Sequence, residues 1–558
     1  MTPIAVEDAD AVNWDKQADV VVVGFGGAGA SAALQAREEG ADVILIDRFG
    51  GGGTTTYSGG VIYAGATRFQ REAGLDDSVD NMLAYLNMEV GDAVRPETLR
   101  RFCEGSAGDV EWLIAHGVEY ASDTYLEKIT YPPEGKYLYY SGNEKSPAFA
   151  ANATPVPRGH RAVGPGFGGA HYIAALRKAA VREGVELMLH TRVTQLVTDA
   201  TGRVLGVEAI ALPADRHAEH QARYAGVSPY VPHNHAKTER AAKAMAALEA
   251  KHGRTLLIRA RGGVILSTGG FAYSRDLVGK SDPVLGAHYD VSHRLSTMGN
   301  DGSGVAMGES VGGATGHMDS VYIARNIAPP EALLEGILVN RDGERFVAED
   351  AYVSLIGGVL ARQPEGKAWL IVSARGFRKS VREALTCGWQ RFKYFGVPML
   401  INYALGGTRR GGTVEALARK AGIDPAALRA TIAAHDADLA AGRPDKVGKT
   451  EELRTPLGKG PFYAINMSME NRHALTKFMT LGGLTVDEDS GAVTRQDGSA
   501  VPGLYAAGMS AVGLHSNGYI SGLSLADGVF SGRRAARHAA AASGPKPANR
   551  PLETAGTA

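Results

Sequence analysis

Near the N-terminus, apolar and polar positions follow one another in blocks that predict a strand, a helix and a second strand. Residues 19–23 form a β-branched apolar run, which is typical of a strand buried on both faces. Residues 30–39 are rich in alanine and favour a helix, and residues 41–46 form a second apolar run that ends at Asp47. This order predicts an α/β fold that begins with a Rossmann-like unit.

The same two patterns predict elements along the rest of the chain, as helical spacing of apolar positions or as short apolar runs. Within residues 413–441, the Asp424-Pro425 step starts a new helix, because aspartate caps a helix and proline fits its first turn. The predicted helices cover 77–112 (two or three helices), 170–183, 237–251 and 413–441, and a last helix follows the glycine-rich stretch 516–528 and ends near residue 542. The predicted strands cover 61–64, 185–190, 192–197, 206–210, 256–258, 262–267, 336–340, 478–487 and 502–508.

Two stretches do not fit this simple pattern. The aromatic block 125–140 is either a substrate-facing loop region or a packed hairpin. Residues 213–253 form an insertion with a proline-containing loop at 228–232, and it could be a lid, an oligomer contact, a peripheral membrane contact or solvated decoration. Its histidines have no cysteine or carboxylate at matched spacing, so no metal site is predicted. These histidines are His217, His220, His233 and His235.

Composition and charge narrow the possible partners. At 558 residues the chain is longer than one ordinary core, so two or more domains are expected. A formal net charge of −1 argues against non-specific binding to nucleic acid or to an anionic membrane. The two cysteines form no C-x-x-C motif, and no apolar run reaches membrane-spanning length. We therefore expect a cytoplasmic protein without a nucleic-acid partner.

The glycines between the first strand and the first helix carry the clearest chemistry. Residues 24–29 form a G-x-G-x-x-G fingerprint, in which Gly24 allows a tight turn and Gly26 lets backbone N–H groups approach a pyrophosphate. Gly29 lets the helix and strand pack closely, and the helix N-terminus faces the phosphate charge. Asp47 lies where a carboxylate can accept a hydrogen bond from a ribose hydroxyl. The pattern predicts a dinucleotide site.

A second glycine-rich stretch, residues 50–60, follows Asp47 and contains several hydroxyl side chains. Exposed amides and hydroxyls at this density suit a polar ring edge or a phosphate, and a flexible linker is the alternative. The predicted strand at 61–64 follows at once, which favours the binding loop over the linker.

Four separated segments resemble one family together, the fumarate reductase/3-ketosteroid dehydrogenase flavoproteins. They are the fingerprint at residues 24–29, the loop at 52–60, the Thr480-x-Gly482-Gly483 turn and the strand at 502–508. The resemblance covers most of the chain between Asp19 and Ala540 and implies FAD rather than NAD. It also implies one FAD-binding domain that is discontinuous in sequence, with an inserted α+β catalytic domain. The implied boundaries are 17–285 and 446–542 for the FAD-binding domain, 286–445 for the catalytic domain and 543–558 for a disordered tail.

Within this family the chain looks most similar to the 3-ketosteroid 4-dehydrogenases. The matching stretches are residues 58–65, 137–144 and 519–524. The 1-dehydrogenases carry a Tyr-Ala-Gly-Pro-Gly pattern near the C-terminus, where this chain has Tyr519-Ile520-Ser521-Gly522-Leu523. Fumarate reductases need arginine and histidine to hold a dicarboxylate. Residues 158–161 offer both types, but the aromatic residues nearby suit a large apolar ligand better.

The resemblance implies a catalytic set of Tyr352, Tyr519 and Ser521, with the backbone N–H near Gly522 assisting at the ketone oxygen. Dehydrogenation beside a ketone needs a group that polarises the carbonyl, a base for the α-proton and a hydride acceptor, which here is flavin N5. A free tyrosine titrates near 10, so a tyrosine base requires a lowered pKa or a relay. The helix that follows Ser521 favours a phenolate at its start.

The same resemblance implies the residues that hold FAD. Family members commonly carry glutamate after the Ala-Ala-Gly strand, where this chain has Met509, and Asp47 is one methylene shorter than a glutamate. The implied FAD-binding residues are Gly24, Gly26, Gly27, Ala28, Gly29, Asp47, Arg48, Thr54, Thr55, Ser58, Gly59, Gly60, Val193, Thr268, Gly269, Gly270, Gly508, Gly522, Ser524 and Leu525.

The resemblance therefore implies an FAD-dependent 3-oxosteroid 4-dehydrogenase, which introduces a C4–C5 double bond into saturated 3-ketosteroids. Its partners are the 3-ketosteroid and an electron acceptor whose identity the sequence leaves open. The alternatives are a 3-ketosteroid 1-dehydrogenase, a fumarate reductase-like enoate reductase and a non-catalytic flavin- or steroid-binding protein.

Overall fold

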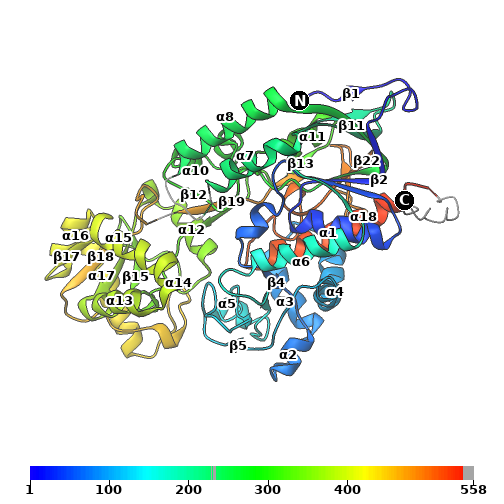
Figure 1. Cartoon of the computed structure of the whole chain (residues 1–558). Helices are drawn as coiled ribbons and strands as arrows, with labels where there is room; N and C mark the ends of the chain where they lie inside the picture. Colours follow the sequence, from blue (N-terminus) through cyan, green and yellow to red (C-terminus); the bar gives the residue numbers. More distant parts are fainter. Residues whose placement is uncertain (228, 230–233, 475, 545–558) are drawn as a thin grey trace.

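The protein is described by a computed structural model that covers residues 1–227, 229, 234–474 and 476–544 (Figure 1). The predicted loop at 228–232, apart from Pro229, and the predicted tail at 543–558, apart from Ser543 and Gly544, lie outside the described residues. No helix in the described part of the chain is long and apolar enough to cross a bilayer.

A nine-stranded sheet joins the two ends of the chain. Its order is β1-β9-β10-β11-β2-β3-β8, and β22 adds to β11 and carries β21. The strands are β1 (Ile4–Ala5), β2 (Lys16–Val23), β3 (Val43–Ile46), β8 (Glu186–Met188), β9 (Thr191–Thr198), β10 (Val204–Ala211), β11 (Arg254–Leu266), β21 (Ala492–Thr494) and β22 (Ala500–Ala506). Because β22 pairs in parallel with β11, the C-terminal segment completes the layer that the N-terminal segment begins. The predicted α/β class is confirmed.

Strand β11 is longer than the sequence pattern indicated. The two strands predicted at 256–258 and 262–267 are one strand of 13 residues. Residues 254–259 pair with β10 in antiparallel fashion, residues 258–260 and 263–266 pair in parallel with β2, and residues 264–266 pair in parallel with β22. A register shift between Ala260 and Gly263 interrupts the pairing with β2, and the one strand joins the antiparallel part of the sheet to the parallel part.

Helices α1 (Gly27–Glu38) and α18 (Leu523–Ala541) lie side by side against this sheet (Figure 1). Small residues allow the close approach. A Cβ at Gly29 would lie 1.9 Å from the Gly24 carbonyl oxygen, and one at Gly532 would lie 2.6 Å from the Ala28 oxygen. Gly24 itself has a φ of 105°, which a residue with a side chain rarely adopts. The predicted roles of Gly24 and Gly29 in the turn and in packing agree with this geometry.

A smaller sheet and its helices pack beside the first layer. The sheet has the order β4-β7-β6-β5, and β5 pairs in parallel with β6, so the packed-hairpin alternative for the aromatic block is wrong. The elements are β4 (Val61–Tyr63), β5 (Thr124–Tyr125), β6 (Leu138–Tyr139), β7 (Gly159–Arg161), α2 (Arg68–Glu72), α3 (Val79–Val90), α4 (Pro96–Ala115), α5 (Pro147–Ala150) and α6 (Gly169–Arg182). The region predicted as two or three helices at 77–112 contains α3 and α4.

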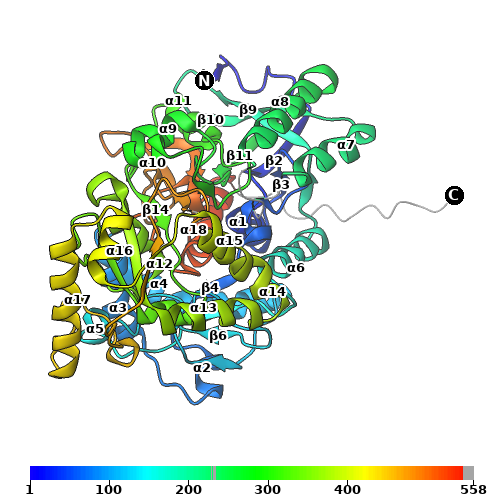
Figure 2. The same cartoon turned by 90° about the vertical axis from the view of Figure 1, so that its left-hand side faces the viewer.

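Residues 331–466 form a second lobe around an antiparallel sheet of order β15-β16-β18-β17 (Figures 1 and 2). Strand β18 lies beyond the predicted boundary at residue 445, yet it pairs with both β16 and β17. Helix α17 begins after Asp424, which accepts a hydrogen bond from the Ala427 N–H, as predicted. The elements are β15 (Ile337–Asn340), β16 (Ala368–Ser373), β17 (Arg409–Gly411), β18 (Phe462–Asn466), α12 (Val353–Ala361), α13 (Ala374–Thr386), α14 (Trp389–Arg391), α15 (Val397–Leu405), α16 (Val414–Ala421) and α17 (Pro425–Ala440).

Short elements connect the lobe to the large sheet. Strand β19 lies between β12 and β14 in a three-stranded sheet, and β13 pairs with β20. The elements are β12 (His293–Arg294), β13 (Thr315–Gly316), β14 (Val321–Ala324), β19 (Lys477–Thr480), β20 (Gly483–Leu484), α9 (Arg275–Ser281), α10 (Pro283–Ala287) and α11 (Ser303–Ser310).

The insertion consists of α7 (Ala214–Ala225) and α8 (His235–His252), of which only α8 was predicted. Gln221 accepts a hydrogen bond from the Gly50 N–H at 3.0 Å, and the Tyr224 ring stacks on Phe49 with centroids 4.2 Å apart. The buried Glu249 carboxylate pairs with Arg48 at 2.8 Å. The insertion therefore packs on the loop that follows β3. No three His, Cys, Asp or Glu side chains among the described residues are grouped to hold a metal ion.

The close contact at Gly29 gives a testable consequence. Gly29→Ala places a Cβ against the Gly24 oxygen, and this overpacking should lower the free energy of unfolding by about 1–3 kcal/mol. Chemical denaturation measures the change.

Gly105→Ala is the matched control, because Gly105 lies on the exposed face of helix α4 and a Cβ added there would meet no atom within 4 Å. Alanine there should leave stability unchanged or raise it by up to about 1 kcal/mol. Equal effects at the two positions would contradict this account of the packing.

Candidate active site

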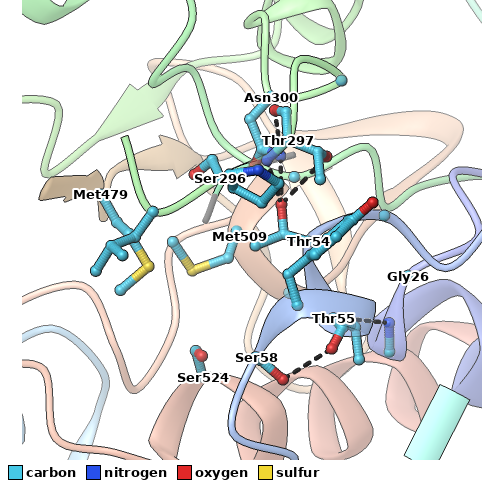
Figure 3. A pocket seen from close by; sticks show the side chains of 18 of the residues that line it. Gly26, Thr54, Thr55, Ser58, Ser296, Thr297, Asn300, Met479, Met509 and Ser524 are labelled. Atoms are coloured by element: carbon cyan, nitrogen blue, oxygen red, sulfur yellow. Dashed lines mark hydrogen bonds between the residues drawn. The ribbon is translucent and has the colours of Figure 1, made fainter. Parts of the chain in front are cut away.

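A cavity of about 780 Å³ lies where the large sheet meets the second lobe, and both parts contribute lining residues. Its size falls in the range of cofactor and ligand sites in proteins. The fingerprint, the loop that follows Asp47 and the start of α18 line one end, as Figure 3 shows for several of them. Segments from β14, β19, α12 and α15 line the other end.

The fingerprint end fits a dinucleotide. A Cβ at Gly26 would have only the Thr55 hydroxyl within 4 Å, at 3.6 Å, so a bound group can approach the backbone there. Helix α1 begins at Gly27, and its first N–H donates to Thr55 Oγ1 at 3.0 Å. The positive end of the helix faces the cavity, which favours a phosphate. The glycines and the helix start thus fit the pyrophosphate of FAD.

Asp47 lies in the cavity wall, at the end of β3. Its carboxylate accepts hydrogen bonds from the Phe25 N–H at 2.8 Å and the Phe49 N–H at 2.7 Å. Burial raises the pKa of Asp47, and these two hydrogen bonds oppose that shift. The carboxylate is therefore held in place by backbone groups, with its cavity side available to a ribose hydroxyl.

Thr54 ties the glycine-rich loop to the segment after β12. Its hydroxyl accepts hydrogen bonds from the Thr297 N–H at 3.0 Å and from Asn300 Nδ2 at 2.8 Å (Figure 3). Ser296, Thr297 and Asn300 line the same cavity. Sequence reasoning missed these three residues, because the only signal was the glycine-rich turn at 299–302.

Most of the predicted FAD-binding residues line this one cavity, although they come from distant parts of the chain. The exceptions are Gly29 and Gly270, which support neighbouring backbone instead. Gly29 packs on Gly24, and the Gly270 N–H donates to Asn300 Oδ1 at 2.9 Å. The lining residues are Gly24, Gly26, Gly27, Ala28, Asp47, Arg48, Thr54, Thr55, Ser58, Gly59, Gly60, Val193, Thr268, Gly269, Gly508, Gly522, Ser524 and Leu525.

Met509 stands where the family commonly has glutamate, and it also lines the cavity. Figure 3 places its thioether close to that of Met479 from β19. The position therefore contributes an apolar surface and no carboxylate.

The three predicted catalytic residues meet at the cavity. Tyr352 is the N-cap residue of α12, whereas Tyr519 and Ser521 precede α18, and all three are lining residues. Two further tyrosines join them. The Tyr139 hydroxyl lies 3.3 Å from Ser521 Oγ, and the Tyr322 ring packs edge-on against Tyr519 with centroids 4.8 Å apart.

Sequence reasoning missed Tyr322, which sits in a short strand without a motif. Tyr139 lay inside the aromatic block 125–140. It does not line the cavity, whereas Thr130 and Tyr131 of the same block do, and the substrate-facing interpretation stays a prediction.

Burial dominates the acid–base properties of this group. It raises the pKa of Tyr352 well above its ordinary value, and the neighbouring Tyr322, Tyr519 and Tyr139 phenols add to the shift. Burial also raises the pKa of Tyr519, although the Ser524 hydroxyl, 3.3 Å away, opposes it. Burial therefore acts against the phenolate that the start of α18 was expected to favour. The phenols are neutral hydrogen-bond donors at neutral pH.

A buried polar network binds the backbone of Tyr352. Its backbone N–H donates to Asn143 Oδ1 at 2.9 Å, and Asn143 Nδ2 donates to Glu89 Oε1, also at 2.9 Å. The Tyr85 hydroxyl donates to the same carboxylate oxygen at 2.6 Å. Burial raises the pKa of Glu89 to about 7. The network fixes the backbone of Tyr352, the N-cap residue of α12, from which its side chain extends.

The arginines and histidine at 158–161 have structural partners. Arg158 is buried and pairs with Asp77 at 2.7 Å, and His160 lies 2.8 Å from the Thr67 hydroxyl. Arg161 donates to backbone carbonyls, among them that of Gly166 at 2.6 Å. None of residues 158–161 lines the described cavity, so they do not form a dicarboxylate clamp there.

The raised pKa of Glu89 predicts a pH-dependent stability. The unfolded chain loses this proton near the ordinary value of 4.5, whereas the folded chain keeps it up to about 7. Ionisation therefore destabilises the folded state increasingly as the pH rises from 4.5 to 7, and fully above that. Glu89→Gln removes the titration, so its Tm relative to the native chain should be higher at about pH 8 than at about pH 5.

Glu72→Gln, at an exposed position in α2, is the control and should show the same relative Tm at both pH values. Thermal unfolding by circular dichroism measures both variants. A Glu89→Gln profile parallel to that of the native chain would argue against a shifted carboxyl.

Comparison with known proteins agrees with this geometry. The FAD binding domain model matches residues 19–525. The chain is 36% identical to 3-oxo-5-alpha-steroid 4-dehydrogenase of Comamonas testosteroni over 517 residues, which is 90% of this chain and 94% of that protein.

Solved structures of the same type also match. The 3-ketosteroid-delta4-(5alpha)-dehydrogenase from Rhodococcus jostii RHA1, solved in complex with 4-androstene-3,17-dione, matches with a TM-score of 0.80 and 31% identity, over 97% of this chain and 100% of that one. The 3-ketosteroid delta1-dehydrogenase from Sterolibacterium denitrificans matches with a TM-score of 0.64 and 20% identity, over 94% and 100% of the two chains, and shows a shared fold. The chain therefore belongs to the FAD-binding domain family, and FAD is its cofactor.

Proposed function

We propose that this protein is an FAD-dependent 3-oxosteroid 4-dehydrogenase that forms the C4–C5 double bond of a saturated 3-ketosteroid. The observation that carries the proposal is the convergence of Tyr352, Tyr519 and Ser521 on the cavity that the dinucleotide fingerprint also lines. Two relatives that exceed 30% identity over 90% or more of the chain are named for this reaction, which supports the same proposal.

The side chains match the parts that the reaction needs. FAD, when bound, supplies the acceptor for the hydride that leaves C5. A neutral buried phenol such as Tyr519 can donate to the ketone oxygen and polarise it, with the Gly522 N–H as a second donor. Polarisation lowers the pKa of the C4 proton, which the phenolate form of a nearby tyrosine can then take, once that tyrosine has passed its own proton to solvent.

Hydroxyl pairs offer a route for that proton. Ser521 lies 3.3 Å from the Tyr139 hydroxyl, and Tyr519 lies 3.3 Å from Ser524. Each pair can pass the proton of a tyrosine through its partner hydroxyl to solvent, so that the phenolate forms only during the reaction and no group is ionised at rest. This arrangement suits tyrosines whose pKa values burial has raised.

Apolar lining favours a steroid over a small acid. Leu295, Val397, Ile401 and Met479 line the lobe side of the cavity. Their surfaces offer burial to a rigid hydrocarbon body, at roughly 25 cal/mol per Å² of apolar area.

We also propose the domain roles that the resemblance implies. The segments at 17–285 and 467–542 would form the FAD-binding domain, and the segment at 286–466 would form the catalytic domain. Since β18 pairs within the lobe, we place the end of the catalytic domain after residue 466 rather than at 445. The electron acceptor and a cytoplasmic location remain predictions.

Anaerobic flavin spectroscopy tests the reaction. A saturated 3-oxosteroid should bleach the flavin absorbance of the purified protein, and the steroid should gain the C4–C5 double bond. Reoxidation of the reduced flavin by fumarate or another enoate, without bleaching by the steroid, would instead indicate an enoate reductase. Steroid binding without any reduction would indicate a binding protein.

Tyr519→Phe should keep the bound flavin and its absorbance yet lower kcat by about 10²–10⁴-fold, the usual contribution of a positioned proton donor or acceptor. Tyr505→Phe is the control, because Tyr505 lies on β22 and is absent from the cavity wall. Steady-state turnover with an artificial acceptor compares the two. Near-native turnover in Tyr519→Phe would remove this hydroxyl from the mechanism.

A further inference from the structure

One face of the β12–β19–β14 sheet forms a wall of the cavity. Tyr322 pairs with Met479, and His293 pairs with Lys477, so each pair shares a face of the sheet. Met479 and Lys477 are two residues apart on β19 and therefore point to the same side. Tyr322, Met479, Lys477 and His293 all line the cavity. The wall thus changes from aromatic and apolar to basic along its length.

The aromatic end and the basic end of this wall are separated by two residues along strand β19. Tyr322 lies at the reacting end, because its ring packs against Tyr519. Two residues of an extended strand span about 7 Å, so the Lys477 backbone lies about that far beyond the Tyr322 and Met479 level. A ligand whose ketone reaches Tyr519 would extend its far end toward Lys477.

Other basic residues also line the cavity. Lys393 lies in the π-helix η4 (Phe392–Gly396), whose Phe395 contacts Lys477, and Arg472 and His473 precede β19 in the chain. Among the described lining residues, the only carboxylates are Asp47 and Asp301, and both belong to the dinucleotide end, where Asp301 pairs with Arg48. The chain as a whole carries a net charge of −1. The positive charge at the far end of the cavity is therefore local, because the chain as a whole is close to neutral.

Lys477 has an aromatic ring and not a carboxylate beside its ammonium group. Its Nζ lies 5.8 Å from the centre of the Phe395 ring, and it forms no ion pair with a carboxylate of the described residues. Burial lowers the pKa of Lys477 to about 8. A half-buried ammonium with no anion beside it is costly, and an anionic ligand group would offset that cost.

We propose that this basic end binds an anionic group at the far end of the substrate, so that the preferred substrate is a 3-oxosteroid whose side chain ends in a carboxylate. The inference rests on the proposed function for the position of the ketone. The apolar wall takes the ring system, and Lys477 pairs with the anion.

Substrate comparison tests this inference. The native enzyme is assayed with a saturated 3-oxosteroid that carries a side-chain carboxylate, with its methyl ester, with its coenzyme A thioester and with a saturated 3,17-dione. We expect kcat/KM for the acid to exceed that for the ester by about tenfold to a hundredfold, which is the usual strength of a charge-assisted hydrogen bond. A preference for the thioester over the acid would place phosphates at the cations instead and would overturn the carboxylate assignment.

Lys477→Met keeps the length of the side chain and removes its charge. The ratio of kcat/KM for the acid to that for the ester should fall by about tenfold or more, and the loss should lie in KM because the anion is remote from the reacting carbon. Lys459→Met, at an exposed position outside the cavity wall, is the control and should keep the ratio.

Binding measurements separate this inference from the proposed function. If no steroid is dehydrogenated, calorimetric titration of the flavin-loaded protein with the acid and the ester still tests the anion preference. Equal affinity or equal kcat/KM for acid and ester, with normal turnover of the 3,17-dione, would overturn the inference and leave the dehydrogenase proposal standing.

Discussion

The close contact between backbone and backbone at the start of α1 is the constraint on which the site depends. Because Gly29 has no side chain, α1 lies against the turn at Gly24 and directs its N-terminus into the cavity. The same helix packs on α18 through Gly528 and Gly532, which face Ala28. The start of α18, and the hydroxyls that precede it, are therefore positioned by the helix whose N-terminus is proposed to bind the pyrophosphate.

Cofactor binding and proton handling thus share one scaffold. The first helix sets the cofactor end, the last helix sets Tyr519 and Ser521, and the second lobe adds Tyr352 and Tyr322 from the opposite side. Helix α12, whose N-cap is Tyr352, is held by the network of Asn143 and Glu89 from the small sheet region. The first helix, the last helix, the second lobe and the small-sheet region must therefore all pack correctly before the tyrosine and serine hydroxyls come together at the cavity.

The sequence predicted what local rules control. Strand, turn and helix at the fingerprint follow from apolar runs and glycine spacing, and the Asp424 cap follows from residue type alone. Contacts across the fold carry no such local signal. Thr297 and Asn300 contact Thr54 because the pairing of β12 with β19 places the segment after β12 beside the glycine-rich loop. Tyr322 contacts Tyr519 because the pairing of β14 with β19 places β14 at the cavity. The parallel pairing of β5 and β6 likewise depends on β7 lying next to β6 and not on a turn.

The pairing of β10 with β11 shows how helices α7 and α8 are joined to the sheet. Ala211 pairs with Arg254, so the chain leaves the sheet and returns to it at adjacent positions. A segment anchored in this way can be lengthened, shortened or exchanged during evolution while the strand register on either side stays intact. Residues 213–253 are therefore a natural place for homologues to diverge, and their contacts with Arg48 and Gly50 would let such divergence tune how firmly the adenosine end of the cofactor is held.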